Sequence, residues 1–202
     1  MNNSNKPMIL ILSNNKYAEV LKNRLASAGY RIKLHNSSVS KILIQREKPD
    51  LIVCYDYTCK LDEKMINLLQ GKLVIMHTSF FPFNKGAHPN LWSIINNTPQ
   101  GVTIYSPTED RWNGKILYQQ ELFFNEDKET LTSTHRKLHQ AIVDLFIENV
   151  DNILSGKIEL YAPLPGGSYH NLHDIDRFLD GKDIPYDMTI KEFKSFISGL
   201  DF

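Results

Sequence analysis

Short apolar runs alternate with longer segments of helical period through the first half of the chain, and this alternation restricts the fold more than any other feature. The runs that read as buried strands are MILIL at 8–12, RIKL at 31–34, DLIVCY at 50–55 and KLVIMH at 72–77. The segments that read as helices are 17–28, 37–46 and 62–70. Strands that alternate with helices form βαβ units, whose strands are parallel and whose connections are right-handed. The sequence therefore predicts an α/β fold with a doubly wound, mostly parallel sheet.

The second half of the chain begins with two β-prone runs, GVTIY at 101–105 and KILYQQELFF at 115–124. A polar loop, SPTEDRWNG, joins them, as expected for an antiparallel edge added to a parallel sheet. Apolar residues then keep helical spacing from 130 to 154, which predicts one long helix. Gly156 is expected to end it.

The last part of the chain is expected to be a short helical tail. Helices are predicted at 174–179 and 189–197, the second of them N-capped by Thr189. At 202 residues, one hydrophobic core can serve the whole chain. We therefore expect an α/β domain over 1–160 and a C-terminal extension over 161–202 that packs on the same domain.

Charge and hydropathy exclude several classes of function. Lys plus Arg and Asp plus Glu number 23 each, so no overall field favours nucleic acid. The apolar runs are too short to cross a bilayer, and the polar start MNNSNK is unlike a secretory signal. We expect a cytoplasmic protein with no nucleic-acid partner and no membrane insertion, and a homodimer is one oligomeric state that the sequence leaves open. Cys54 and Cys59 match neither a CxxC redox motif nor a zinc pair and are expected to be reduced thiols.

The residues that follow the parallel strands are where chemistry is expected, because ligands collect beyond the carboxyl ends of such strands. His77 ends the fourth predicted strand. The chain has no GxGxxG and no GxxxxGK motif, which excludes the dinucleotide and P-loop fingerprints. His135 and His139 lie four residues apart on the long helix, but no third ligand accompanies them, so no metal site is expected.

The segment LVIMHTSFFPFNKGAHPNLWSIINNTPQGVTI at 73–104 resembles the formyltransferase family. The family motif is Asn, any residue, His, any residue, Ser, two apolar residues and Pro, followed by Arg or Lys with Gly. It is matched here by His77, Ser79, Phe80, Phe81, Pro82, Lys85 and Gly86. The block AHPNLWS is similar to the branch that formylates amino groups of nucleotide-linked sugars, and GSYH at 167–170 resembles a stretch near the end of those proteins.

This resemblance implies a Rossmann-like formyltransferase fold and transfer of a formyl group from 10-formyltetrahydrofolate to a nucleotide-linked amino sugar. The implied substrate is a dTDP-4-amino-4,6-dideoxysugar, and the implied pathway is the synthesis of lipopolysaccharide or another surface polysaccharide. In the reaction a neutral amine attacks the formyl carbon, an oxyanion forms, and a proton leaves the nitrogen. Family members meet these demands with an Asn, a His and an Asp, and His77 stands at the place of the His.

The other two places are changed. Ile75 stands where the family has Asn, and it offers no donor to an oxyanion. An ungapped register from GVTI puts Trp112 at the place of the Asp. The residues then expected to line the folate site are Ile75, Trp112, Asn113 and Gly114. Glu109 and Asp110 are the carboxylates that a rearranged loop can bring to His77 as a replacement base.

The remaining contacts are expected on the side of the nucleotide sugar. The resemblance implies substrate contacts from Ser79, Asn84, Lys85, His88, Asn90, Trp92, Tyr169 and His170. For Lys85 and His88 a solvated loop position is an equal alternative, and Trp92 is most simply a wall of the core or of a pocket. Tyr169 and His170 follow two glycines, which let the backbone approach a ligand closely.

Three functions follow as hypotheses. The first is a sugar N-formyltransferase with a non-standard catalytic set centred on His77. The second is a catalytically impaired pseudoenzyme that binds the nucleotide sugar or the folate. The third is a different reaction on the same scaffold, such as hydrolysis of a formyl group.

Overall fold

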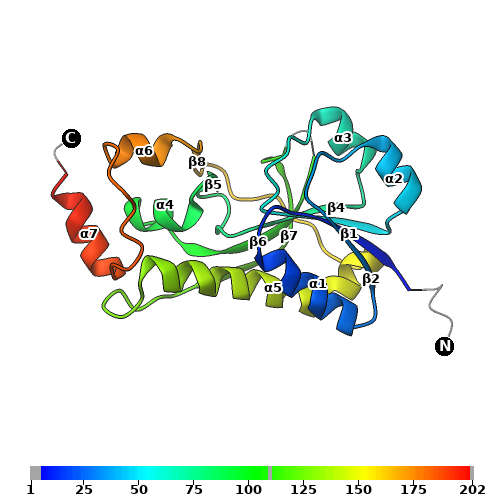
Figure 1. Ribbon diagram of the computed structural model, residues 1–202, viewed down its shortest axis with the longest axis horizontal. Coiled ribbons are helices and arrows are strands. Elements are labelled where there is room, and N and C mark those ends of the chain that lie inside the picture. The colour runs from blue at the N-terminus through cyan, green and yellow to red at the C-terminus, as the bar shows by residue number, and fades with distance from the viewer. Residues whose placement is uncertain (1–5, 109–110, 201–202) are drawn as a thin grey trace. The chain divides into compact units, whose positions relative to one another are not determined.

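The computed structural model describes residues 6–108 and 111–200 (Figure 1). The strands are β1 (Met8–Leu12), β2 (Arg31–His35), β3 (Leu51–Tyr55), β4 (Leu73–His77), β5 (Lys85–Gly86), β6 (Gln100–Pro107), β7 (Gly114–Leu122) and β8 (Tyr169–His170). The helices are α1 (Tyr17–Ser27), α2 (Lys41–Glu47), α3 (Glu63–Leu68), α4 (Pro89–Ile95), α5 (Leu131–Ser155), α6 (Asp174–Phe178) and α7 (Ile190–Ser198).

The main sheet has six strands in the order β2-β1-β3-β4-β6-β7. β1 pairs in parallel with β2 and with β3, and β3 pairs in parallel with β4. β6 and β7 are neighbours joined by a short loop, whereas a parallel pair needs a crossover of roughly a dozen residues or more, so these two strands are antiparallel. The predicted doubly wound, mostly parallel sheet with an antiparallel edge is confirmed.

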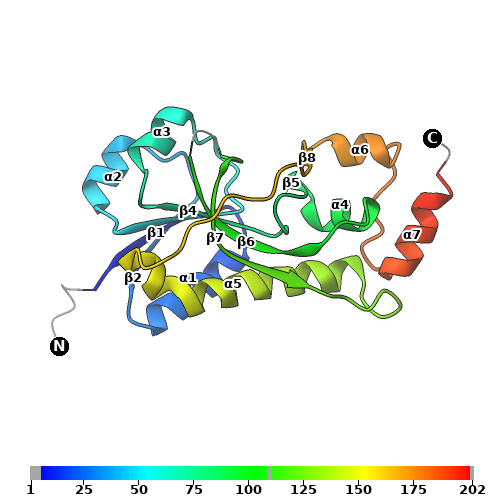
Figure 2. The same cartoon turned by 180° about the vertical axis from the view of Figure 1, so that it is seen from behind.

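Helices cover both faces of the parallel strands. Figures 1 and 2 show α1 on one face of these strands and α2 and α3 on the other. The C-terminal half of α5 lies beside α1, where Arg24 bonds to Asp144. Every residue of β1, β3 and β4 is buried. Strands covered on both faces read as unbroken apolar runs, which is why these three were the clearest in the sequence.

The described residues form two compact units. The first unit lies within Met1–His77, Ile104–Tyr118 and Ile142–Ala162, and it contains the parallel strands. The second unit lies within Thr78–Thr103, Gln119–Ala141 and Pro163–Phe202, and it contains α4, α6 and α7. The chain passes from the first unit to the second directly after His77. The expected division into 1–160 and 161–202 stays a prediction.

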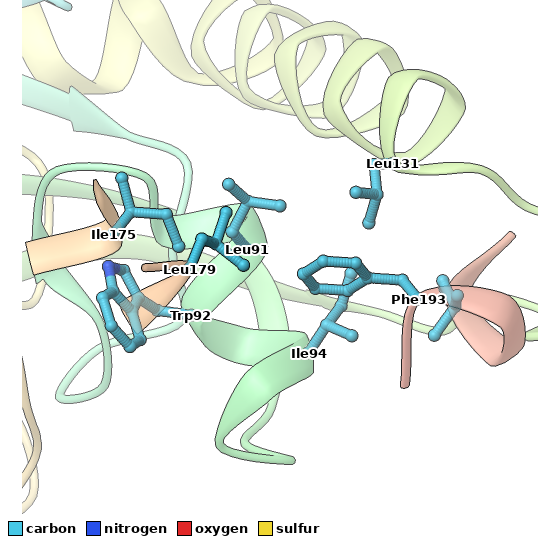
Figure 3. Packing of buried hydrophobic residues seen from close by; sticks show 8 residues of the cluster. Leu91, Trp92, Ile94, Leu131, Ile175, Leu179 and Phe193 are labelled. Atoms are coloured by element: carbon cyan, nitrogen blue, oxygen red, sulfur yellow. The ribbon is translucent and has the colours of Figure 1, made fainter. Parts of the chain in front are cut away.

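The second unit has an apolar cluster of its own, to which the C-terminal tail contributes. Figure 3 shows side chains of α4, α5, the α6 segment and α7 that converge on one another. The buried members of the cluster are Leu91, Trp92, Ile94, Leu131, Ile175, Leu179, Ile190 and Phe193. Thr189 begins α7 with a capping box, in which its hydroxyl accepts from the Glu192 amide and the Glu192 side chain accepts from the Thr189 amide. The two predicted tail helices are present.

The second helix starts later than predicted. The segment 37–46 reads as helical, but α2 begins at Lys41 because Ser40 caps it, with its hydroxyl accepting from Leu43 N at 3.2 Å. The preceding loop is held by the Tyr57 hydroxyl, which accepts from Val39 N at 3.0 Å and donates to the Ser37 carbonyl at 2.7 Å. A long-range contact of this kind leaves no local pattern in the sequence.

A short parallel pair between β5 and β8 was not predicted. Lys85 aligns with Tyr169 and Gly86 with His170. A Cβ on Gly86 would lie 2.0 Å from the His170 carbonyl oxygen, so a side chain at this position would block the pairing. Strands of two residues are too short to show a period, and the sequence segments around them read only as loops.

Candidate active site

His77 is the last residue of β4 and lies at the carboxyl end of the parallel strands. It is only 6 % exposed. Side chains alternate along a strand, so Ile75 points to the same face of the sheet as His77. Ile75 aligns with Cys54 of β3. The imidazole is therefore held at the edge of an apolar surface, where ligands of such sheets collect.

Trp112 lies against His77. The two ring centroids are 5.1 Å apart and the planes meet at 66°, an edge-to-face contact. Trp112 sits in the loop between β6 and β7, which is closed by Thr108 N donating to the Asn113 carbonyl at 2.9 Å. Residue 112 thus lies next to the imidazole, and its assignment to the place of the family's Asp stays a prediction. Glu109 and Asp110, the expected replacement carboxylates, lie outside the described residues.

Gly114 explains how tightly this loop is folded. A Cβ at this position would stand 2.1 Å from the Ser106 carbonyl oxygen, so the backbones of β6 and β7 approach in a way that only glycine allows. On the β6 side the Tyr105 hydroxyl donates to the Arg111 carbonyl at 2.7 Å. Gly114 therefore supports the position of Trp112 through the backbone.

Arg111 is a further charged residue of this region that the sequence analysis missed. Its Nη2 donates to the Tyr57 carbonyl at 2.6 Å, and its Cζ stands 5.4 Å from the centre of the Trp112 ring. Its Nε is buried and has no hydrogen-bond acceptor. Burial raises the pKa of the Cys54 thiol to about 12, with the Arg111 charge opposing the rise, so Cys54 is a protonated thiol. These contacts left no sign in the sequence, because a single arginine in a polar loop is typical of a solvated surface position.

Asn84 and Asn90, both expected to contact the substrate, make structural contacts in the second unit. Asn84 is fully buried, and its Nδ2 donates to Thr98 Oγ1 at 2.7 Å. Its φ of 54° is in the left-handed region, which asparagine tolerates better than most residues. Asn90 Nδ2 donates to the Leu131 carbonyl at 3.2 Å and to Thr134 Oγ1 at 3.0 Å, and so ties α4 to α5.

Two buried oxygens in the second unit lack hydrogen-bond partners. They are Asn90 Oδ1 and Ser79 Oγ. Native structures leave few such atoms unsatisfied, so both remain candidates for contact with a bound molecule. The expectation that Ser79 and Asn90 contact the substrate stays a prediction.

The aromatic residues of the second unit are stacked. Trp92 and His170 have ring centroids 3.9 Å apart and planes within 5° of parallel. Trp92 is buried and belongs to the apolar cluster of Figure 3, while Tyr169 is half exposed. Burial lowers the pKa of His170, and the Asp174 charge opposes that shift, so the imidazole is neutral near pH 7. Trp92 is thus a wall of the core that presents one face to His170.

Lys85 and His88 flank the turn that leads into α4. Lys85 Nζ lies 5.3 Å from the centre of the Phe81 ring. His88 precedes Pro89, the first residue of α4, with φ 52°. Burial lowers its pKa, and the charge of Asp176 is the largest opposing influence. Lys85 therefore carries the positive charge of this turn, whereas His88 is a neutral donor and acceptor.

The expected ligand contacts divide cleanly between the two units. The residues expected on the folate side, which are Ile75, Trp112, Asn113 and Gly114, lie in the first unit with His77 and Arg111. The residues expected on the sugar side, which are Ser79, Asn84, Lys85, His88, Asn90, Trp92, Tyr169 and His170, lie in the second unit. Each unit thus carries one set of expected contacts.

No metal centre is found in the part of the chain that the structure describes. No group of three or more His, Cys, Asp or Glu side chains is arranged to hold an ion within 6–108 and 111–200. The Nε2 atoms of His135 and His139 lie 3.1 Å apart as a hydrogen-bonded pair. None of the helices in these ranges is long and apolar enough to cross a bilayer.

Comparison with known proteins identifies one family. The model of the family described as formyl transferase matches residues 3–150. Among solved structures, one similar protein is the formyltransferase PseJ from Anoxybacillus kamchatkensis, whose sequence is 30 % identical to this chain. Its crystal structure is a complex with UDP-4,6-dideoxy-4-formamido-L-AltNAc and tetrahydrofolate. It superposes with a TM-score of 0.82 over 92 % of this chain and 96 % of that one.

Two curated relatives show how far the similarity extends. The dTDP-4-amino-4,6-dideoxyglucose formyltransferase of Mycobacterium bovis is 24 % identical over 84 % of this chain and 76 % of its own length. The methionyl-tRNA formyltransferase of Fusobacterium nucleatum is 28 % identical, but the match covers 57 % of this chain and only 37 % of that protein. The likeness therefore extends over more of both chains for the sugar-modifying relative.

Proposed function

This chain belongs to the formyl transferase family, and on that premise we propose that it transfers a formyl group from 10-formyltetrahydrofolate to the amine of a nucleotide-linked 4-amino-4,6-dideoxysugar. The complex of PseJ with a UDP-linked formamido sugar and the dTDP-linked sugar of the mycobacterial relative make UDP and dTDP the nucleotides to test. The proposal puts the reaction in the cytoplasm, in the synthesis of lipopolysaccharide or another surface polysaccharide. It includes no nucleic-acid partner, and the assembly to test is a homodimer.

The observation that carries the proposal is the position of His77. A buried imidazole at the carboxyl end of β4 begins the run HTSFFPFNKG, within a chain that PseJ matches over nearly its full length. In this reaction the amine nitrogen forms a bond to the formyl carbon, the bond from that carbon to the folate nitrogen breaks, and a proton passes from the amine to the folate nitrogen. An imidazole can accept and return that proton near pH 7. We assign this role to His77.

The residues around His77 fit the formyl donor only in part. A flat indole and a guanidinium with a free N–H suit a flat ring that bears carbonyl oxygens. Ile75 offers no donor to the oxyanion, however, and one such donor is typically responsible for about 10²- to 10³-fold in rate. We therefore expect transfer that is slower than in a site with an amide at this position.

The edge-to-face contact of Trp112 with His77 favours a second function. The resemblance puts a carboxylate at position 112, and this chain has an indole there, in contact with the imidazole. In that case the protein binds the nucleotide sugar or the folate without turnover, as a sensor or as a partner of an active relative. Hydrolysis of a formyl group would be a third outcome on the same scaffold.

One experiment separates these functions. Purified protein is incubated with 10-formyltetrahydrofolate and with UDP- and dTDP-linked 4-amino-4,6-dideoxysugars, and the sugar is analysed by mass spectrometry, while calorimetry measures binding of each compound. A formamido product supports the transferase, and tight binding without product supports the binding protein. Free formate released without a formamido product indicates hydrolysis. Absence of both binding and product would contradict all three.

A further inference from the structure

Arg111 is held firmly, yet one of its donors has no acceptor. Nη2 donates to the Tyr57 carbonyl at 2.6 Å, and the guanidinium stands over the Trp112 ring with Cζ 5.4 Å from its centre. Nε is buried without a partner. Nη2 therefore holds the loop, whereas the Nε–H has no acceptor among the described residues.

An unsatisfied N–H of this kind is costly and uncommon. Buried polar atoms in native proteins nearly always have a partner, and the exceptions call for a bound ligand, ion or water. Within 6–108 and 111–200, Arg111 also makes no ion pair. A partly buried cation that has a buried free donor, and no ion pair with any described residue, is arranged to receive an oxygen acceptor from outside the chain.

The position of Arg111 indicates which ligand that is. Its ring contact is with Trp112, which in turn contacts His77, and its charge acts on Cys54, the neighbour of Ile75 in the sheet. All of these residues lie in the first unit, together with the residues expected to line the folate site. The residues expected to hold the nucleotide sugar lie in the second unit. The free donor therefore belongs to the folate side.

We propose that Arg111 recognises the folate co-substrate by donating a hydrogen bond from Nε to one of its carbonyl or carboxylate oxygens. This inference rests on the proposed function, because the folate is the formyl donor of that reaction. The rigid plane of the guanidinium fixes the direction of the Nε–H, so Arg111 selects the position of the acceptor and not merely its charge. Arg111 is then a specificity determinant for folate in this chain.

Substitution by lysine separates this role from a purely structural one. Arg111→Lys keeps a positive charge over Trp112 and a donor for the Tyr57 carbonyl, but it removes the directed Nε–H. Arg111→Met removes charge and donors together. Arg46→Lys is the matched control, because Arg46 is mostly exposed and forms an ion pair with Glu47 at 2.7 Å on the surface.

The test measures dissociation constants of 5-formyltetrahydrofolate, tetrahydrofolate and UDP for these variants and for the unaltered protein, with melting curves to verify folding. Loss of one hydrogen bond to a charged donor is expected to weaken both folates roughly 10- to 100-fold in Arg111→Lys and Arg111→Met. UDP binding and the Arg46→Lys variant should stay within about twofold of the unaltered protein. A loss restricted to 5-formyltetrahydrofolate identifies the formyl oxygen as the acceptor, and an equal loss for both folates identifies another oxygen of the folate.

Three results would overturn the assignment. Folate binding by Arg111→Lys within about twofold of the unaltered protein would show that Nε contributes nothing. An equal loss of UDP binding would show that Arg111 serves the fold or the nucleotide. Failure of the unaltered protein to bind either folate would refute the proposed function itself, and with it the ligand assigned here.

Discussion

Replacement of Ile75 by asparagine tests whether an oxyanion donor at this position would speed the proposed reaction. Ile75 is 2 % exposed, aligns with Cys54 and shares a face of the sheet with His77. Removing a buried isoleucine costs about 1.5–3 kcal/mol, and burying an unpaired amide costs a further ~1–3 kcal/mol. For a chain of this size each kcal/mol lowers the melting temperature by about 2–4 °C, so we expect a fall of roughly 5–24 °C.

The same change is expected to raise the rate of formyl transfer. An amide that donates to the oxyanion typically raises the rate by about 10²- to 10³-fold, and part of that rate increase should appear in Ile75→Asn. Ile75→Val is the matched control, because it costs only ~0.5–1.5 kcal/mol and adds no donor. Rates are measured by mass spectrometry of the sugar product, at a temperature well below the melting point of each variant.

The base is tested in the same series. Trp112→Asp adds a carboxylate next to His77, and Ile75→Asn with Trp112→Asp should exceed either single variant, since both groups act on the same step. The comparison of Ile75→Asn with Ile75→Val is made both in the unaltered protein and in the Trp112→Asp variant. If Ile75→Asn transfers the formyl group no faster than Ile75→Val in either of them, the idea that a missing donor slows transfer is wrong.

Three further predictions concern the parts that hold the site. Gly114→Ala should lower the melting temperature measured by calorimetry, because its Cβ would stand 2.1 Å from the Ser106 carbonyl oxygen, and overpacking costs about 1–3 kcal/mol. Phe193→Ala, at a fully buried position of the second unit, should cost ~3–5 kcal/mol in chemical denaturation. Bonding to Lys137 is the main cause that lowers the pKa of Glu129 below its ordinary 4.5, so stability present above that pH is lost as pH falls through the lowered pKa. Glu129→Gln should therefore reduce the drop in melting temperature between about pH 5 and about pH 3.

The order of strands and helices was predictable because it depends on local periodicity. β1, β3 and β4 are buried on both faces, so their sequences are unbroken apolar runs, and the long period of α5 spans almost its whole length. The position of His77 was predictable for the same reason, since it ends such a run. The register that put Trp112 beside it followed from a resemblance and not from periodicity.

The features that were missed depend on contacts between distant residues. The pairing of Gly86 with His170 joins segments far apart in the chain, and two-residue strands carry no period. The start of α2 depends on the Tyr57 hydroxyl, which holds the loop before Ser40. The role of Arg111 depends on which of its nitrogens has a partner, and only coordinates show that.

The most direct test of the account is the rate of formyl transfer with and without the imidazole of His77. The measurement is a single-turnover reaction in which a ¹³C-labelled formyl group on tetrahydrofolate is followed onto the sugar amine. His77→Asn should lower the rate by about 10²- to 10⁴-fold, while His35→Asn, on the edge strand β2, should leave it unchanged. Equal rates in the unaltered protein and in His77→Asn would contradict the assignment of the reaction to the carboxyl end of β4.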